Sequence, residues 1–187
     1  MRFSRHERYL TIDALEEAEE RTSRYYCIPP FRWQSVPYDL LTLQDPEWRP
    51  LPEGMLARTR RIRREQREKC FYRIELNDPG ILAAAHRENL RAEIYPFLLY
   101  ILTHEMVHLV RLSHILTEVE EAAVCPLGEE DRVNLVARRI LAPTAHPAIE
   151  RILRRFQPDR AAEMTRLPLP GNAMASNARQ AKDRLRV

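Results

Sequence analysis

Two histidines and a glutamate stand together in residues 102–108, Leu-Thr-His-Glu-Met-Val-His. His104 and His108 are four residues apart, so on an α-helix they lie one turn above each other and can direct both imidazoles to one point. This His-Glu-x-x-His spacing is typical of a zinc site, in which Glu105 can reach a water molecule on the metal. The segment therefore predicts zinc-assisted hydrolysis, with His104 and His108 as metal ligands and Glu105 as the general base.

The helix that would carry this motif is strongly apolar. Residues 97–102, Phe-Leu-Leu-Tyr-Ile-Leu, precede the motif, and Leu109 and Val110 follow it. We expect the helix to begin near Pro96 and to continue to about Leu112 or beyond. Ionisable side chains inside such a helix are costly to desolvate unless they have partners. A metal ion is one such partner; the competing interpretation is a buried helix with hydrogen-bonded histidines.

A catalytic zinc ion usually has three protein ligands and a water molecule. Glu130 is the preferred candidate for the third ligand. It opens a predicted helix over residues 129–141, whose apolar face could pack against the motif helix. This arrangement requires the motif helix to end soon after Ser113, because a longer helix would carry the chain too far from the histidines.

Other residues compete with Glu130 for this position. His114 follows His108 by six residues, as in the extended pattern His-Glu-x-x-His-x-x-Gly-x-x-His. Arg111 stands where that pattern requires a glycine to break the helix. The remaining alternatives are Glu118, Glu120, Glu121 and His146.

Residues 130–143, Glu-Asp-Arg-Val-Asn-Leu-Val-Ala-Arg-Arg-Ile-Leu-Ala-Pro, resemble a stretch of the ImmA/IrrE-type metallopeptidases, Glu-x-x-Ala-Asn-x-Phe-Ala-x-x-Leu-Leu-Met-Pro. That family belongs to the zincins and also has His-Glu-x-x-His upstream. Glu130 falls on its ligand position and Asn134 on its asparagine. The resemblance covers residues 101–143 and implies a gluzincin-like ligand set in a cytosolic protease that acts on a regulatory protein. The chain departs from the pattern at Val133, Val136 and Ala142.

The pattern along the chain predicts an α+β fold, mostly helical and zincin-like, with a small sheet. Residues 71–77 alternate apolar and polar side chains, which indicates a half-buried strand before the motif helix. By the resemblance this would be the edge strand, able to bind an extended protein or peptide substrate through its backbone. Proline punctuates an irregular segment over residues 25–52. Helices are expected over residues 11–22 (with a capping box from Asp13 to Glu16), 54–70, 81–94, 129–141 and 147–156.

The predicted helix over residues 54–70 is basic. It supports an alternative function, a non-catalytic zinc-binding regulator that binds nucleic acid through residues 58–69. The net charge of +3 is too small to favour nucleic acid by itself, and a solvated helix face is the preferred explanation of the pattern. The basic residues are Arg58, Arg60, Arg61, Arg63, Arg64, Arg67 and Lys69.

Length and composition fit one soluble domain over residues 1–166 with a flexible tail over 167–187. The chain has 187 residues, 44% hydrophobic and 30% charged, and no apolar run long enough for a signal peptide or a membrane span. Three cysteines without a pairing pattern predict a reducing cytoplasm, with the thiols in the core. They are Cys27, Cys70 and Cys125.

A peptidase would also use a hydrogen-bond donor beside the scissile carbonyl. The sequence does not single out this donor; four residues could serve, and packing explains each of them as well. They are Tyr95, Tyr100, His114 and His146.

Overall fold

The structure, a computed structural model, describes residues 1–62, 70–113, 115, 128–144 and 146–156. Its fold is α+β and mostly helical, as predicted, with one three-stranded sheet. Two short 3-10 turns, Arg91–Glu93 and Ala142–Thr144, link helices. The main elements are α1 (Arg5–Tyr26), α2 (Pro30–Trp33), β1 (Tyr38–Leu41), β2 (Ala57–Ile62), β3 (Phe71–Leu76), α3 (Asp78–Arg87), α4 (Ile94–Ser113), α6 (Glu129–Leu141) and α7 (Pro147–Phe156).

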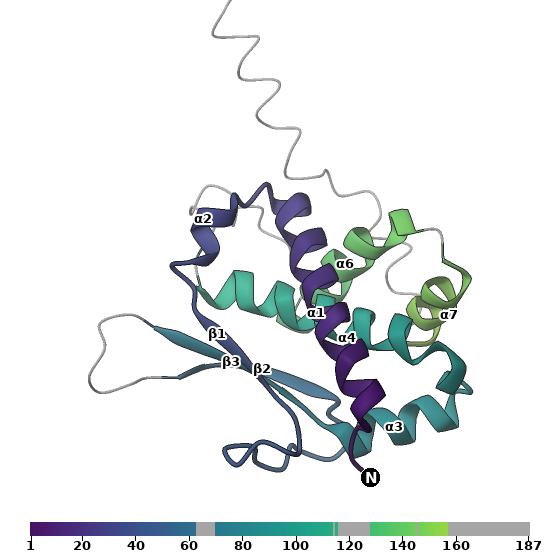
Figure 1. Cartoon of the computed structure of the whole chain (residues 1–187). Helices are drawn as coiled ribbons and strands as arrows, with labels where there is room; N and C mark the ends of the chain where they lie inside the picture. Colours follow the sequence, from purple (N-terminus) through teal and green to yellow (C-terminus); the bar gives the residue numbers. More distant parts are fainter. Residues whose placement is uncertain (63–69, 114, 116–127, 145, 157–187) are drawn as a thin grey trace, which may run out of the picture.

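Helix α4 is the element that the others surround. Helix α1 crosses it, the sheet packs on another side, and α6 and α7 cover more of its surface (Figure 1). A helix enclosed in this way buries apolar residues around most of its circumference, which explains the uniformly apolar sequence. Leu98, Leu102 and Leu109 are fully buried. The helix begins and ends close to the predicted positions.

Helix α1 is longer than predicted because its cap lies further upstream. The Glu7 amide donates to Ser4 Oγ (3.2 Å), and the Ser4 amide donates to Glu7 Oε2 (2.6 Å). This capping box satisfies two amides at the start of the helix, so Asp13 lies inside it and caps nothing. The helix ends at Cys27, in the left-handed conformation with φ 53°. Cys27 is exposed, so its predicted burial in the core was wrong.

The strand order is β1-β3-β2, with β1 parallel and β2 antiparallel to β3. The predicted strand is therefore central, and the expectation of an edge strand at 71–77 was wrong. Strand β3 is buried on both faces, since Ile74 lies in the core and Glu75 is also fully buried. The alternation of apolar and polar residues predicted one solvent-exposed face, but Glu75 on that face is buried in ion pairs with Arg58 and Arg60. Among the described residues, β1 and β2 are the two edge strands, and β2 is the one that packs against α4.

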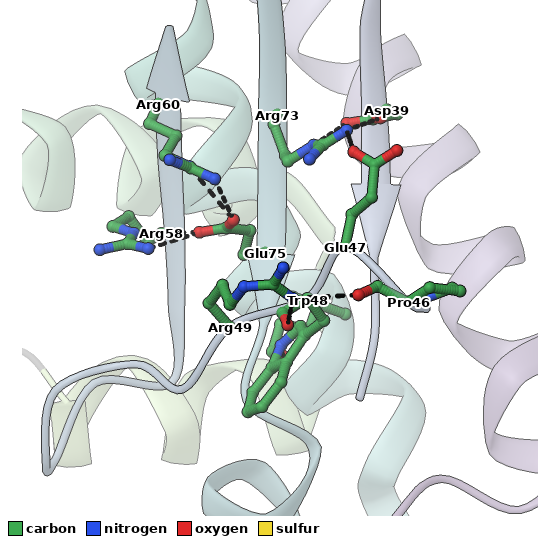
Figure 2. Close-up of polar contacts among 10 residues, drawn as sticks. Asp39, Pro46, Glu47, Trp48, Arg49, Arg58, Arg60, Arg73 and Glu75 are labelled. Carbon is green, nitrogen blue, oxygen red and sulfur yellow. Dashed lines mark hydrogen bonds and ion pairs between the residues drawn. The ribbon is translucent and has the colours of Figure 1, made fainter. Parts of the chain in front are cut away.

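The predicted basic helix was also wrong, because residues 57–62 form β2. Tertiary pairing overrides the helix propensity of an arginine-rich segment. In a strand, Arg58 and Arg60 share one face, where both guanidiniums reach the Glu75 carboxylate (Figure 2). Thr59 faces the other way, toward α4. Residues 63–69, the rest of that prediction, lie outside the described residues.

The second half of the chain follows the prediction more closely. Helices α6 and α7 have the predicted bounds, whereas the helix expected over 81–94 is divided into α3 and the turn Arg91–Glu93. Asn77 starts α3 by accepting from the Gly80 amide (3.1 Å). Within the described segments, none of the helices has both the length and the apolar character needed to cross a bilayer. Cys125 and the predicted tail over 167–187 lie outside those segments.

Candidate metal centre

Helix α4 presents both histidines of the motif on one face. The two rings meet edge to face, with centroids 4.8 Å apart, and the distance from His104 Nε2 to His108 Nε2 is 3.1 Å. Their side chains are only 15% and 16% exposed, respectively. The four-residue spacing thus brings two imidazole nitrogens to the same point, as predicted.

Glu130, in the first turn of α6, completes the cluster. Its carboxylate oxygens lie 3.4 Å from His104 Nε2 and 3.3 Å from His108 Nε2. Helix α4 ends at Ser113, which leaves room for the chain to return, as the Glu130 hypothesis requires. His114, Glu118, Glu120 and Glu121 lie outside the described residues.

Two contacts hold α6 against α4 at this point. Arg111 donates to both carboxylate oxygens of Glu129, at 2.6 and 2.9 Å. In addition, Val107 of α4 and Val133 of α6 are fully buried in one small apolar cluster. The side chains of these neighbouring glutamates therefore have different partners. Glu129 binds Arg111, and Glu130 faces the histidines.

The three donor groups could hold one metal ion. Two ligands at 2.0–2.1 Å from a tetrahedral zinc ion lie about 3.4 Å apart. The separation of the two imidazole nitrogens, 3.1 Å, is close to this value. Glu130 places a different oxygen beside each imidazole, at 3.3 and 3.4 Å, and one ligand atom from each of the three residues lies within 4.8 Å of the other two. The Glu130 side chain is 72% exposed, so the cluster is open to solvent on its side. Two imidazole nitrogens and a carboxylate are donors that suit zinc.

The electrostatics favour the protonation states that bind metal. Burial lowers the pKa of His108, so the neutral imidazole predominates at neutral pH. A hydrogen bond with His104 lowers the pKa of Glu130 and keeps its carboxylate ionised. His104 Nδ1 is buried without a hydrogen-bond partner among the described residues. Such an atom costs free energy, which metal binding at Nε2 would offset.

Glu105 lies beside this cluster and is held by the sheet. The Thr59 hydroxyl on β2 donates to Glu105 Oε2 (2.8 Å) and also lies 3.2 Å from the Glu105 carbonyl oxygen. The side chain is buried, and this desolvation raises the pKa of Glu105. A carboxylate with a raised pKa is a stronger base than an exposed one.

One pocket of about 330 Å³ contains Glu105 and the three candidate ligands. Residues 55–59, which are the start of β2 and its approach, form one wall. Tyr100 and Ile101 of α4 and Phe156 of α7 add an apolar wall. The size falls within the range of small-molecule and substrate sites, roughly 300–1,000 Å³.

Of the described candidates for a donor to the scissile carbonyl, one lines the pocket and two do not. Tyr100 lines the pocket. Tyr95 instead bonds to Glu17 of α1, and His146 Nδ1 accepts from the Ala148 amide (3.2 Å) at the start of α7. His146 is also absent from the metal-binding cluster found among the described residues.

Sequence reasoning missed Thr59 and the strand that carries it. The available signal was the alternation of residues 57–61, Ala-Arg-Thr-Arg-Arg, which separates Thr59 from Arg58 and Arg60. The high density of arginine obscured that alternation.

No protein-family model, curated protein or solved structure matches the chain. The likeness to the ImmA/IrrE-type metallopeptidases therefore depends on the quoted residues alone. Of these, Glu130 lies beside the histidines, and Asn134 lies half-buried on α6.

Proposed function

We propose that this protein is a zinc-dependent metallopeptidase of the zincin type. The observation that carries the proposal is the convergence of His104, His108 and Glu130, with Glu105 in the same pocket. These residues supply both requirements for metal-assisted hydrolysis, namely a ligand set for the ion and a separate base.

His104, His108 and Glu130 would hold the ion. When bound there, zinc supplies a water molecule with a pKa of about 7 and polarises the scissile carbonyl. Glu105 would take the proton from that water as its oxygen adds to the carbonyl carbon. The same carboxyl group would then deliver the proton to the amine nitrogen as the carbon–nitrogen bond breaks. Thr59 would keep the Glu105 carboxylate in position for both transfers.

Strand β2 would bind the substrate. Its residues line the pocket, and among the described residues no strand pairs with its outer edge. An extended peptide could therefore add to this edge through backbone hydrogen bonds, with the scissile bond above Glu105. The strand that borders the site thus differs from the one predicted, but the mode of binding is the same.

The alternative, a zinc-binding regulator with a basic nucleic-acid-binding helix, has less support. Its helix is a strand over residues 57–62, and Arg58 and Arg60 bind Glu75 there.

The test is Glu105→Gln in zinc-loaded full-length protein. General acid–base catalysis contributes about 10²–10⁴-fold, so peptide hydrolysis should fall by that factor. Zinc content, measured by atomic emission, should stay at the wild-type value because Glu105 is not a ligand. Undiminished turnover in this variant would exclude the base role.

A further inference from the structure

The outer face of the sheet carries a row of charged side chains that the proposed chemistry does not use. On this face Arg73 of β3 donates to both oxygens of Asp39 on β1 (2.9 Å each) and also pairs with Glu47 (2.6 Å) (Figure 2). Arg73 is therefore matched by two carboxylates. Nearer the free edge of the sheet, the ratio of arginines to carboxylates is reversed.

At that edge, two arginines share one carboxylate. Arg58 Nη2 lies 2.6 Å from Glu75 Oε2, and Arg60 Nη2 lies 2.8 Å from Glu75 Oε1. The Glu75 side chain is 0% exposed, whereas those of Arg58 and Arg60 are 35% and 42% exposed. The edge therefore has an excess of one positive charge, and this excess is accessible to solvent.

Both guanidiniums also retain hydrogen-bonding capacity. Each has five N–H donors in a fixed fork. Arg58 and Arg60 each direct their Nε and one terminal nitrogen at Glu75. Within the described part of the chain, the remaining donors have no acceptor. A carboxylate that approached the edge of β2 could bind them without displacing Glu75.

These arginines are continuous with the proposed peptidase site. Arg58 itself lines the pocket that contains Glu105, and Thr59, between the two arginines, bonds to Glu105. Side chains of a strand alternate between the two faces of a sheet. A peptide residue beside Thr59 would point toward α4, and its two neighbours would point to the outer face beside Arg58 and Arg60.

We infer that the substrate is an extended acidic segment, with carboxylate side chains at alternate positions that pair with Arg58 and Arg60 on the outer face. We expect the inward-facing residue between them to be apolar, because Tyr100, Ile101 and Phe156 line the pocket that it would enter. This inference rests on the proposed function and names its substrate class.

The test uses zinc-loaded full-length protein and four quenched fluorescent peptides. Three of the peptides have the same sequence except at two alternate positions, i and i+2. Both of these positions are Glu in the first peptide, Gln in the second and Lys in the third. The fourth carries the Glu pair moved by one residue. Mass spectrometry confirms that the same bond is cleaved. We expect kcat/KM to be about tenfold higher for the Glu peptide than for the Lys peptide, as two partly exposed charge pairs would give. The moved Glu pair should lose this advantage.

Two variants separate charge recognition from a structural role. Glu75→Gln leaves both arginines without their shared carboxylate. It should therefore raise the Glu-to-Lys ratio, which is kcat/KM for the Glu peptide divided by kcat/KM for the Lys peptide. Arg58→Gln/Arg60→Gln/Glu75→Gln removes the cations without leaving a buried charge and should bring the ratio close to one. The inference would be overturned if the wild-type protein showed no charge preference, or if the preference survived in the triple variant. It would also be overturned if the peptide with the moved Glu pair were cleaved as efficiently as the first Glu peptide.

A binding measurement distinguishes this inference from the proposed function. Fluorescence anisotropy of the same peptides with zinc-loaded Glu105→Gln protein gives the Glu-to-Lys ratio in Kd without any turnover. If the wild-type protein cleaves no peptide but Glu105→Gln binds the Glu peptide about tenfold more tightly, the peptidase proposal fails and the acidic-segment inference stands. Equal binding of all four peptides would overturn the inference, whether or not any is cleaved.

Discussion

The hydroxyl of Thr59 donates a hydrogen bond of 2.8 Å to Oε2 of Glu105. This bond connects β2, the strand that borders the pocket, to the carboxylate beside the candidate ligands. The same strand that would hold a substrate backbone therefore also orients the proposed base. A shift of β2 along its own direction would change the position of both together.

Thr59→Val should lower kcat while zinc content stays unchanged. Valine has nearly the same shape and suits a strand, but it cannot donate to Glu105. Hydrogen bonds to charged groups contribute about 1.5–3 kcal/mol, so a loss of about tenfold or more in kcat is expected. Thr59→Ser retains the hydroxyl and should keep most of the activity. Equal kcat values for the Val and Ser variants would show that the hydroxyl does not position Glu105.

Glu130→Ala should weaken zinc binding, whereas Glu129→Ala should not. The two residues are neighbours in the first turn of α6, but only Glu130 faces the histidines, while Glu129 binds Arg111. Loss of groups that only support a ligand costs about 10–100-fold in metal affinity, so loss of a ligand should cost at least about a hundredfold. Competition with a fluorescent zinc chelator measures both constants.

Equal zinc affinities in Glu129→Ala and Glu130→Ala would contradict the assignment of Glu130 as a ligand. If the two alanine variants lose zinc affinity equally, Glu130 acts only through the docking of α6. If neither loses affinity, the third ligand lies elsewhere in the chain.

Arg58→Ala/Arg60→Ala should destabilise the fold by about 3–5 kcal/mol, because it leaves the fully buried Glu75 carboxylate without a counter-charge. Adding Glu75→Gln should recover most of this loss, since a neutral amide needs no ion pair. Urea denaturation of the three proteins measures the free energies of unfolding. A double variant within about 0.5 kcal/mol of wild type, the range of ordinary surface substitutions, would contradict the importance of this ion pair.

Leu102→Ala should destabilise the fold by about 2–5 kcal/mol, because Leu102 is fully buried in the middle of α4 and its loss leaves a cavity. Leu112→Ala on the same helix is the control. Leu112 is 41% exposed, so its truncation should cost little. Thermal or urea unfolding compares them, and similar losses for both would contradict the enclosed position of α4.

The local elements that the sequence predicted best are those with strong, uninterrupted periodicity. The apolar run before His104 defined α4, and the helical spacing of apolar residues defined α6 and α7. The cluster of His104, His108 and Glu130 was predicted from the motif, from the position of Glu130 at the start of a helix, and from the resemblance of residues 130–143 to a metallopeptidase stretch. The motif and the helix start are local features, whereas the contact of Glu130 with the histidines spans more than 20 residues.

The sheet was harder to predict because long-range pairing decides it. Glu75 reads as a solvent-facing residue, but two arginines from a separate strand bury it. Conversely, Arg58 and Arg60 read as helical because their partner in β3 is distant in sequence. Thr59 could not be recognised as a partner of Glu105 for the same reason, since 46 residues separate them.

Crystals grown with zinc and measured on both sides of the zinc absorption edge would locate the metal ion. The structure predicts an anomalous peak about 2.0–2.2 Å from His104 Nε2, His108 Nε2 and a Glu130 oxygen, with Glu105 outside bonding distance. A fully zinc-equilibrated crystal without a peak at this position, or with the two imidazoles turned away from each other, would contradict the assignment.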